Sequence, residues 1–193
     1  GVVHAIVPDG KGGWFVGGSF SEIGGLLREN LVHITADGRV DVPWVANVSN
    51  AVRVLALSED KQTLYIGGDF QGPNSVMTEP RDYVAAVNAA TGAVMAWNPA
   101  PDGAVRAIVP VGSKVYLGGA FTQVDGNIDR FSVARVGDAA SGGHVVDEFD
   151  PQCTDGAVNA IAVRPDGEVV YLAGDFRIVK GGVVRNRIAA FET

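Results

Sequence analysis

The feature that most constrains the fold is a six-residue phrase that occurs four times along the chain. It reads FVGGSF at 15–20, YIGGDF at 65–70, YLGGAF at 116–121 and YLAGDF at 171–176. Counted from one closing phenylalanine to the next, the copies lie 50, 51 and 55 residues apart. Sequence repetition with a period near 50 residues is typical of solenoids, propellers and other repeat arrays. We therefore interpret the chain as a series of repeated units.

Each unit contains four short segments whose composition favours β-strands. The first is apolar and rich in valine and alanine, the second is the repeated phrase, and the fourth ends in a large aromatic residue. β-branched and aromatic residues over so few positions favour strands over helices. Besides the phrase itself, the predicted strands are first segments at 3–7, 52–57, 105–109 and 158–163, third segments at 31–34, 83–87, 131–136 and 187–191, and fourth segments at 39–44, 93–97 and 144–149.

Four antiparallel strands per unit, with side chains that grow from small in the first to large in the fourth, describe a propeller blade. Small side chains suit the crowded axis of a ring, and large ones fill its wide rim. The predicted fold is an all-β β-propeller of four-stranded antiparallel blades at 1–50, 51–103, 104–156 and, incompletely, 157–193. These are about 3.75 blades, whereas closed rings have about four to eight. We therefore expect an arc of a larger propeller, or a ring that a second copy of the chain closes.

The composition excludes several classes of partner and site. The net charge of −7, without any block of basic residues, disfavours nucleic acid, whose binding depends on neutralising phosphates. No apolar run approaches the roughly 20 residues of a membrane-spanning helix, so we expect no membrane insertion. The single cysteine, Cys153, excludes a disulfide within the chain and a zinc site built from several cysteines. We also expect no cofactor.

The paired glycines of the repeated phrase predict close packing between backbones. Glycine weakens a strand, and it is tolerated where a bulge forms or another backbone approaches. A phosphate-binding loop would instead need glycines that open a helix, and no helix is predicted. An arginine also precedes each third strand; we expect it to tie loops to carboxylates or carbonyls between blades, the alternative being a ring that binds anions. The blade-signature residues, interpreted as structural, are Gly17, Gly18, Phe20, Gly67, Gly68, Phe70, Gly118, Gly119, Phe121, Gly174, Phe176, Arg28, Arg81, Arg130 and Arg185.

Taken together, the apolar strand, the Pro-Asp-Gly turn, the GGxF phrase, the arginine before the third strand and the closing aromatic resemble the bacterial delta-sixty β-propeller repeat. The resemblance covers essentially the whole chain. It implies an extracellular or cell-surface location in bacteria and a role as scaffold or interaction module. Kelch propellers, which also carry a diglycine, fit less well, because they place aromatic residues soon after it whereas Trp44 lies far beyond Gly18.

The second unit departs from the repeat in the loop that follows Phe70. Its segment 72–80 is longer than its counterparts and contains two prolines. Irregular loops on a regular scaffold often bind ligands, although neutral variation in loop length is an alternative. The candidate binding residues are Gly72, Asn74, Ser75, Met77 and Glu79.

No catalytic residue or metal ligand is predicted. The three histidines, His4, His33 and His144, fall in different segments without a repeated partner. Asp125 begins a sequence that imitates a calcium loop, D-x-N-x-D, but the sixth and twelfth positions are arginine and valine where glycine and glutamate are needed. The variable residue of GGxF also offers no common metal shell, because it is Ser19, Asp69, Ala120 and Asp175 in the four units.

These observations lead to one main functional hypothesis and two alternatives. The main hypothesis is a non-enzymatic extracellular propeller segment that presents loops to a protein or glycan within a larger surface or secreted assembly. The first alternative is a propeller hydrolase or lyase with its site at the ring axis. The second is a purely structural spacer. A fold of this kind does not by itself decide among them.

Overall fold

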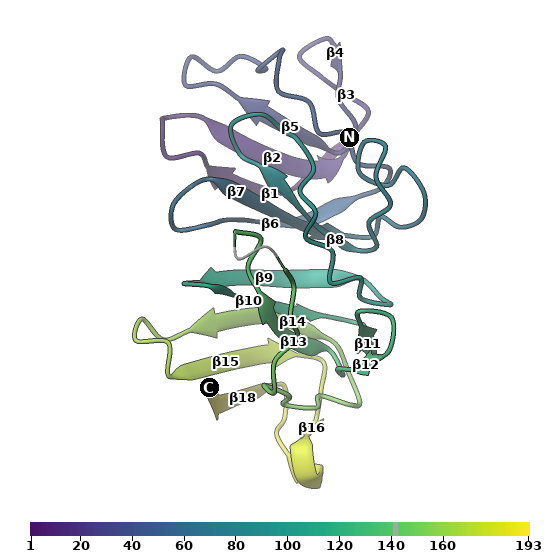
Figure 1. Cartoon of the computed structure of the whole chain (residues 1–193), viewed down its shortest axis with the longest axis vertical. Helices are drawn as coiled ribbons and strands as arrows, with labels where there is room; N and C mark the ends of the chain where they lie inside the picture. The colour runs from purple at the N-terminus through teal and green to yellow at the C-terminus, as the bar shows by residue number, and fades with distance from the viewer. Residues whose placement is uncertain (141–142) are drawn as a thin grey trace.

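The computed structural model describes residues 1–140 and 143–193, and it has the predicted all-β architecture. Within these residues, four three-stranded antiparallel sheets follow one another, one for each predicted unit, from the top to the bottom of Figure 1. The second strand of each unit is the central one. The sheets are β1 (Val2–Pro8), β2 (Trp14–Ser19) and β5 (Leu31–Ile34); β6 (Val52–Leu57), β7 (Thr63–Gly68) and β8 (Val84–Asn88); β9 (Val105–Val111), β10 (Lys114–Gly119) and β13 (Val133–Gly137); and β14 (Val158–Val163), β15 (Val169–Gly174) and β18 (Ile188–Glu192).

A small hairpin follows the central strand in blades 1, 3 and 4. In Figure 1 the hairpins of blades 1 and 3 lie on the right-hand side, and the hairpin of blade 4 lies at the bottom. Blade 2 has the irregular loop at 71–80 instead, where Val76 forms isolated bridges with Val48 and Glu79. The hairpins are β3 (Glu22–Ile23) with β4 (Leu26–Leu27), β11 (Gln123–Val124) with β12 (Ile128–Asp129), and β16 (Ile178–Val179) with β17 (Val183–Val184), the last joined by the 3-10 turn η1 (Lys180–Gly182).

The fourth segment of blades 1, 2 and 3 differs from the predicted strand. It pairs with the third strand through a single bridge, at Val40 in blade 1, Val94 in blade 2 and Val146 in blade 3. Beyond the bridge, Trp44 and Trp97 turn into the space between blades, which a continuing strand would prevent. The carbonyl groups that a strand ladder would use are taken instead by the signature arginines, as described below. The blades are therefore three-stranded with a bridged outer segment.

The hydrophobic core lies between neighbouring blades. One cluster combines Phe15 and Trp44 of blade 1 with Leu64 and Ile66 of blade 2, and corresponding clusters fill the two following junctions. Trp44 donates its indole N–H to the carbonyl of Ala89 in blade 2 at 3.1 Å. Since each junction buries the apolar side chains of two blades, neighbouring blades stabilise one another.

The two glycines of the repeated phrase make different contacts. A Cβ at Gly17 would lie 2.6 Å from Cγ1 of Val52, a residue of the next blade's first strand. A Cβ at Gly68 would lie only 2.0 Å from the carbonyl oxygen of Ala51 in its own blade. The first glycine thus sets the approach of the next blade, and the second sets a backbone contact inside its blade. The first kind of contact recurs at Gly67 with Val105 and at Gly118 with Val158, and the second kind at Gly18, Gly119 and Gly174.

Candidate functional site

Each first strand contains a β-bulge at the same place, and a polar residue occupies each bulge. The pairing with the second strand skips the residue that directly follows one valine of each first strand. These valines are Val3, Val52, Val105 and Val158. A bulge changes the direction of a side chain, and bulges are enriched beside functional sites. All four side chains are exposed, and successive first strands contact one another, so these side chains line the inner edge of the arc. We name these residues the axial row: His4, Arg53, Arg106 and Asn159.

In blades 1, 2 and 4 the axial-row residue binds the variable residue of GGxF in its own blade. Nε2 of His4 lies 2.9 Å from Oγ of Ser19. Nε of Arg53 donates to Oδ2 of Asp69 at 2.8 Å, and Nη2 of the same arginine donates to the same oxygen. The guanidinium of Arg53 is therefore partly neutralised by one carboxylate.

Blade 3 lacks this arrangement because its variable residue is Ala120. Arg106 instead reaches across to blade 4, where its Nη1 donates to Oδ1 of Asn159 at 2.9 Å. The amide of Asn159 in turn donates to Oδ2 of Asp175 at 3.1 Å. The axial row thus continues from blade 3 to blade 4 as a hydrogen-bonded chain of side chains.

Along the inner edge of blades 2 to 4 these groups surround an open hollow of about 400 Å³, lined by Arg53, Asp69, Arg106 and Asn159. The two arginines of the lining are hydrogen-bond donors, Asp69 is an anionic acceptor, and the amide of Asn159 can both donate and accept. Such a surface can hold a polar ligand through several directed hydrogen bonds.

The axial row is not among the sites predicted from the sequence. The pattern of Asp69 and its counterparts excludes a common metal shell, and Arg53 and Arg106 fall within the predicted apolar first strands. The signal that could have found the row is a polar residue directly after the valine that begins each first segment, four times over. Its meaning depends on the bulge, which is a property of strand pairing.

The loop at 71–80 is built on the linker between blades 1 and 2. Ser75 is buried, and its Oγ accepts a hydrogen bond from the backbone N–H of Arg81 at 2.7 Å. The N–H of Met77 donates to the carbonyl of Asn47 at 2.8 Å. These contacts fix the loop in one conformation, and Ser75 serves that purpose within it.

The other candidate residues of this loop lie nearer the solvent. Asn74, Met77 and Glu79 are exposed, and the N–H of Gly72 donates to Oδ1 of Asp82 at 2.7 Å. The loop begins two residues after Asp69, so it lies at the same end of blade 2 as the axial row. Three of the five candidates therefore remain accessible to a ligand on that face.

The signature arginines bind carbonyl groups within their own blade, whereas we expected ties between blades. Nη2 of Arg28 donates to the carbonyl of Val42, in the outer segment, at 2.8 Å. The equivalent arginines of blades 2 and 3 make the same bond, and Arg185 of blade 4 donates Nη1 to the carbonyl of Val184. The corresponding bonds run from Arg81 to Met95 at 2.8 Å and from Arg130 to Asp147 at 2.6 Å. Arg28 and Arg81 are buried by this arrangement, which does not form a ring open to anions.

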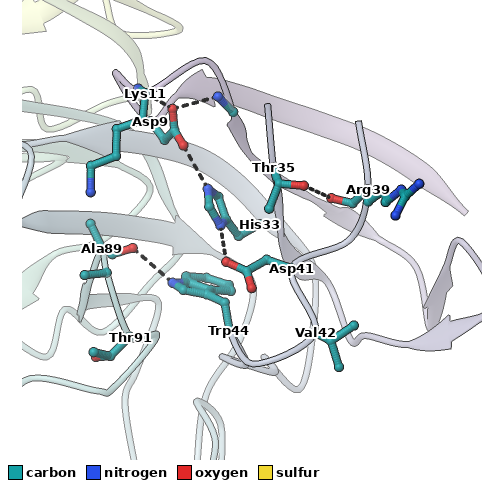
Figure 2. A network of polar contacts seen from close by, with 12 residues as sticks. Asp9, Lys11, His33, Thr35, Arg39, Asp41, Val42, Trp44, Ala89 and Thr91 are labelled. Atoms are coloured by element: carbon teal, nitrogen blue, oxygen red, sulfur yellow. Dashed lines mark hydrogen bonds and ion pairs between the residues drawn. The ribbon is translucent and has the colours of Figure 1, made fainter. Parts of the chain in front are cut away.

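His33 lies between two carboxylates at the opposite end of blade 1 (Figure 2). Its Nδ1 is 2.8 Å from Oδ2 of Asp41, and its Nε2 is 3.0 Å from Oδ2 of Asp9. The ring also stacks on Phe15, with 4.6 Å between centroids. Because both ring nitrogens are engaged, His33 connects the first turn of the blade to its outer segment and has no free nitrogen to act on a substrate.

The residues that imitate a calcium loop are held apart in the β11–β12 hairpin. Oδ1 of Asp125 lies 3.1 Å from Nε2 of His144, and Oδ1 of Asp129 accepts a hydrogen bond from Gln123. In the described part of the chain, no three His, Cys, Asp or Glu side chains are grouped so as to hold a metal ion. Within the same residues, no helix is long and apolar enough to cross a membrane.

Cys153 is buried at the junction of blades 3 and 4, and we expect it to be unreactive in the folded protein. Burial, with smaller contributions from Asp155 and Asp150, raises the pKa of its thiol to about 12. Since the thiolate is the reactive form, an aromatic disulfide reagent at about pH 8 should label the native protein far more slowly than the protein unfolded in urea. Equal labelling rates in the two states would contradict the assigned burial.

Asp102 is expected to make folding sensitive to acid. Burial alone would raise the pKa of this carboxyl, but hydrogen bonds from the Thr122 hydroxyl, the Gln123 N–H and the Thr122 N–H together hold it below the ordinary value of 3.8. Its contribution to stability is therefore present above the unfolded-state pKa and is lost as the pH falls through the lower folded-state pKa. Asp102→Asn should be less stable than the wild type at neutral pH.

The difference in stability between the wild type and Asp102→Asn should become smaller in acid. Protonation of Asp102 then removes from the wild type the charged hydrogen bonds that the variant already lacks. Urea unfolding of both proteins at a series of pH values between neutrality and about pH 3 would measure it. A difference that stays constant across this range would show that the Asp102 carboxylate is not the cause.

No family model matches this chain, and no curated protein does either. Solved structures do resemble it. A chain of the mitotic checkpoint complex is 18% identical with a TM-score of 0.59, and the match covers 89% of this chain and 45% of that one. The WD40 β-propeller domain of Doa1 is 12% identical with a TM-score of 0.55, over 89% of this chain and 47% of that domain.

The periplasmic gluconolactonase of Pseudomonas aeruginosa is 18% identical with a TM-score of 0.53, over 86% of this chain and 48% of the enzyme. At these identities the likeness shows the fold alone, and it confirms the β-propeller prediction. The chain spans less than half of the length of each of these proteins. Its four blades thus form a partial propeller.

Proposed function

We propose that the chain is a non-enzymatic recognition segment of a propeller, and that it binds a protein or glycan partner at the axial row. The observation that carries this proposal is the set of four β-bulges, which turn one polar side chain per blade toward the same edge. A core packed for stability alone has no need of four exposed polar residues at equivalent bulges. The hollow between Arg53 and Arg106 gives this edge a concave binding surface.

The engagement of the charged groups supports binding over catalysis. Arg53 is paired with Asp69, and Asn159 bridges Arg106 and Asp175. Groups held in this way are oriented to accept and donate hydrogen bonds without a change of protonation. Such preorganisation favours recognition.

We further propose that the segment works in an extracellular bacterial assembly, and that further blades or a second copy complete its ring. The location follows from the resemblance to delta-sixty repeats. The completion follows from the apolar side chains at the two ends of the arc, since Val3 is 55% exposed and Ile188 is 63% exposed. Their counterparts in the inner junctions are buried: Val52, Val105 and Val158 for Val3, and Val84 and Val133 for Ile188.

A hydrolase is the second candidate, and one contact favours it. Nε2 of His4 lies 2.9 Å from Oγ of Ser19, within the distance of a base and its nucleophile. In the described residues, however, no carboxylate contacts the other nitrogen of His4 to orient it. A fluorophosphonate probe should therefore leave Ser19 unlabelled, and labelling that Ser19→Ala abolishes would favour the hydrolase.

The proposed function is tested by ligand arrays with a variant that removes the axial row. The row variant combines Arg53→Gln, Arg106→Gln and Asn159→Ala, and the control combines Arg39→Gln and Arg164→Gln. The control arginines are exposed and lie in turns at the other end of the blades. Glycan and protein arrays should identify a ligand whose affinity falls at least about tenfold in the row variant and stays unchanged in the control. The absence of any such ligand from both arrays would overturn the proposal.

A further inference from the structure

Arg106 differs from the other cation of the axial row in its charge environment. In blade 2, Asp69 neutralises Arg53, whereas the equivalent residue in blade 3 is Ala120. The carboxylate that lies nearest is Asp175 of blade 4, whose Oδ2 is 3.9 Å from Nη1 of Arg106 and whose side chain is 61% exposed. Arg106 is therefore the less neutralised of the two guanidinium groups.

The donors of Arg106 are also available on one side. Nη1 is used by Asn159, while among the described residues Nε and Nη2 have no hydrogen-bond partner. The side chain is 42% exposed, so these two N–H groups can reach solvent. Nε and Nη2 form the edge of a guanidinium that binds both oxygens of a carboxylate in parallel. Arg106 thus presents a carboxylate-binding edge to the hollow.

The charge of the hollow restricts the ligand further. Two arginines and one aspartate line it, and Asp175 lies at its edge, 3.9 Å from Nη1 of Arg106. One carboxylate on the ligand can pair with Nε and Nη2 of Arg106, because the contacts of Arg106 with Asn159 and Asp175 both use Nη1. A run of carboxylates, as in an acidic peptide, would also meet Asp69 and Asp175 and be repelled by them.

The groups beside Arg106 suit hydroxyl groups. Asp69, held in place by Arg53, can accept a hydrogen bond, and Asn159 can donate and accept. A sugar hydroxyl both donates and accepts, so neighbouring hydroxyls can satisfy both kinds of group. An acidic sugar ring combines one carboxylate with flanking hydroxyls and therefore matches the charge and the hydrogen bonds together.

Resting on the proposed recognition function, we infer that the hollow binds an acidic sugar, whose carboxylate pairs with Arg106 and whose ring hydroxyls bind Asp69 and Asn159. The neighbouring units of the oligosaccharide then run along the axial row. Arg106 determines the selectivity for acidic over neutral sugars, because it supplies the charge that a neutral sugar does not need.

The experiment uses short oligomers of galacturonate, glucuronate and mannuronate, measured by calorimetry against their methyl esters. Esterification removes the charge and keeps the ring and its hydroxyls. At least one acid oligomer should bind about tenfold or more tightly than its ester. Arg106→Gln should remove most of the preference for the acid over its ester. Arg106→Lys should retain only part of that preference, and Arg39→Gln should leave it intact.

Three outcomes would overturn the inference. An ester that binds as well as its acid would show that the carboxylate is not recognised. A hexaglutamate peptide that binds as tightly as the sugars would favour a peptide partner. Failure of every acid oligomer would exclude the ligand class. If a neutral glycan or a protein still binds in a manner that depends on the axial row, the proposed recognition function survives and only the ligand class is wrong.

Discussion

Replacing Gly68 with alanine is expected to lower the free energy of unfolding by about 3 kcal/mol or more. The new Cβ would lie 2.0 Å from the carbonyl oxygen of Ala51, which is too close for any atom pair and involves backbone on both sides. That carbonyl also accepts a hydrogen bond from the N–H of Asp69 at 3.0 Å. The strands must move apart at this point, so the substitution disturbs the bulge as well as the packing.

Urea unfolding followed by circular dichroism would measure this effect, with Gly143→Ala as the matched control. A Cβ at Gly143 meets nothing within 4 Å, so the control should change stability by no more than about 0.5 kcal/mol. If Gly68→Ala proved as stable as the control, the assigned close approach between the backbones of Gly68 and Ala51 would be contradicted.

The second large effect is expected at Trp97, whose replacement by alanine should cost about 3–5 kcal/mol. Its side chain is 3% exposed and lies between blades 2 and 3. The indole N–H donates to the carbonyl of Gly137 at 2.7 Å, and the ring meets Tyr65 edge-on at 5.1 Å between centroids. The substitution therefore leaves a cavity and an unpaired carbonyl at a junction between blades.

Trp97→Phe separates these two contributions. Phenylalanine keeps much of the ring volume and removes the indole N–H, so its cost should be about 1–3 kcal/mol, the cost of leaving a buried acceptor unpaired. Thermal unfolding of both variants should rank wild type above Trp97→Phe and Trp97→Ala last. The reverse order for the two variants would mean that Trp97 does not fill the junction.

The strands could be predicted from the sequence because their pattern is local and repeated. The segments at 52–57 and 158–163 coincide with β6 and β14, since valine-rich runs between turns leave few alternatives to a strand. The outer segment was harder to predict. Val40 and Trp44 look like parts of one strand, but the tryptophan is drawn into the next junction by contacts that are distant in sequence.

The candidate site depended on information that the sequence does not carry by itself. The repeat identifies Asp69 as a variable position, but its partner Arg53 lies 16 residues earlier and becomes adjacent only through the pairing of β6 with β7. The repeat also identifies Arg28, but the predicted tie between blades is wrong, because the carbonyl that Arg28 binds belongs to Val42 in the same blade. Repetition identifies which positions matter, and the pairing register decides what they touch.

The bulges have a consequence for how such a chain can diversify. Arg53 and Arg106 are exposed, while the valines that precede them are fully buried in the junctions. The exposed axial-row residue can therefore be exchanged without disturbing the packing of the buried valine beside it. Each blade contributes one such exchangeable position to a common edge, so new specificities could arise by independent substitutions, blade by blade, with little change in the stability of the ring.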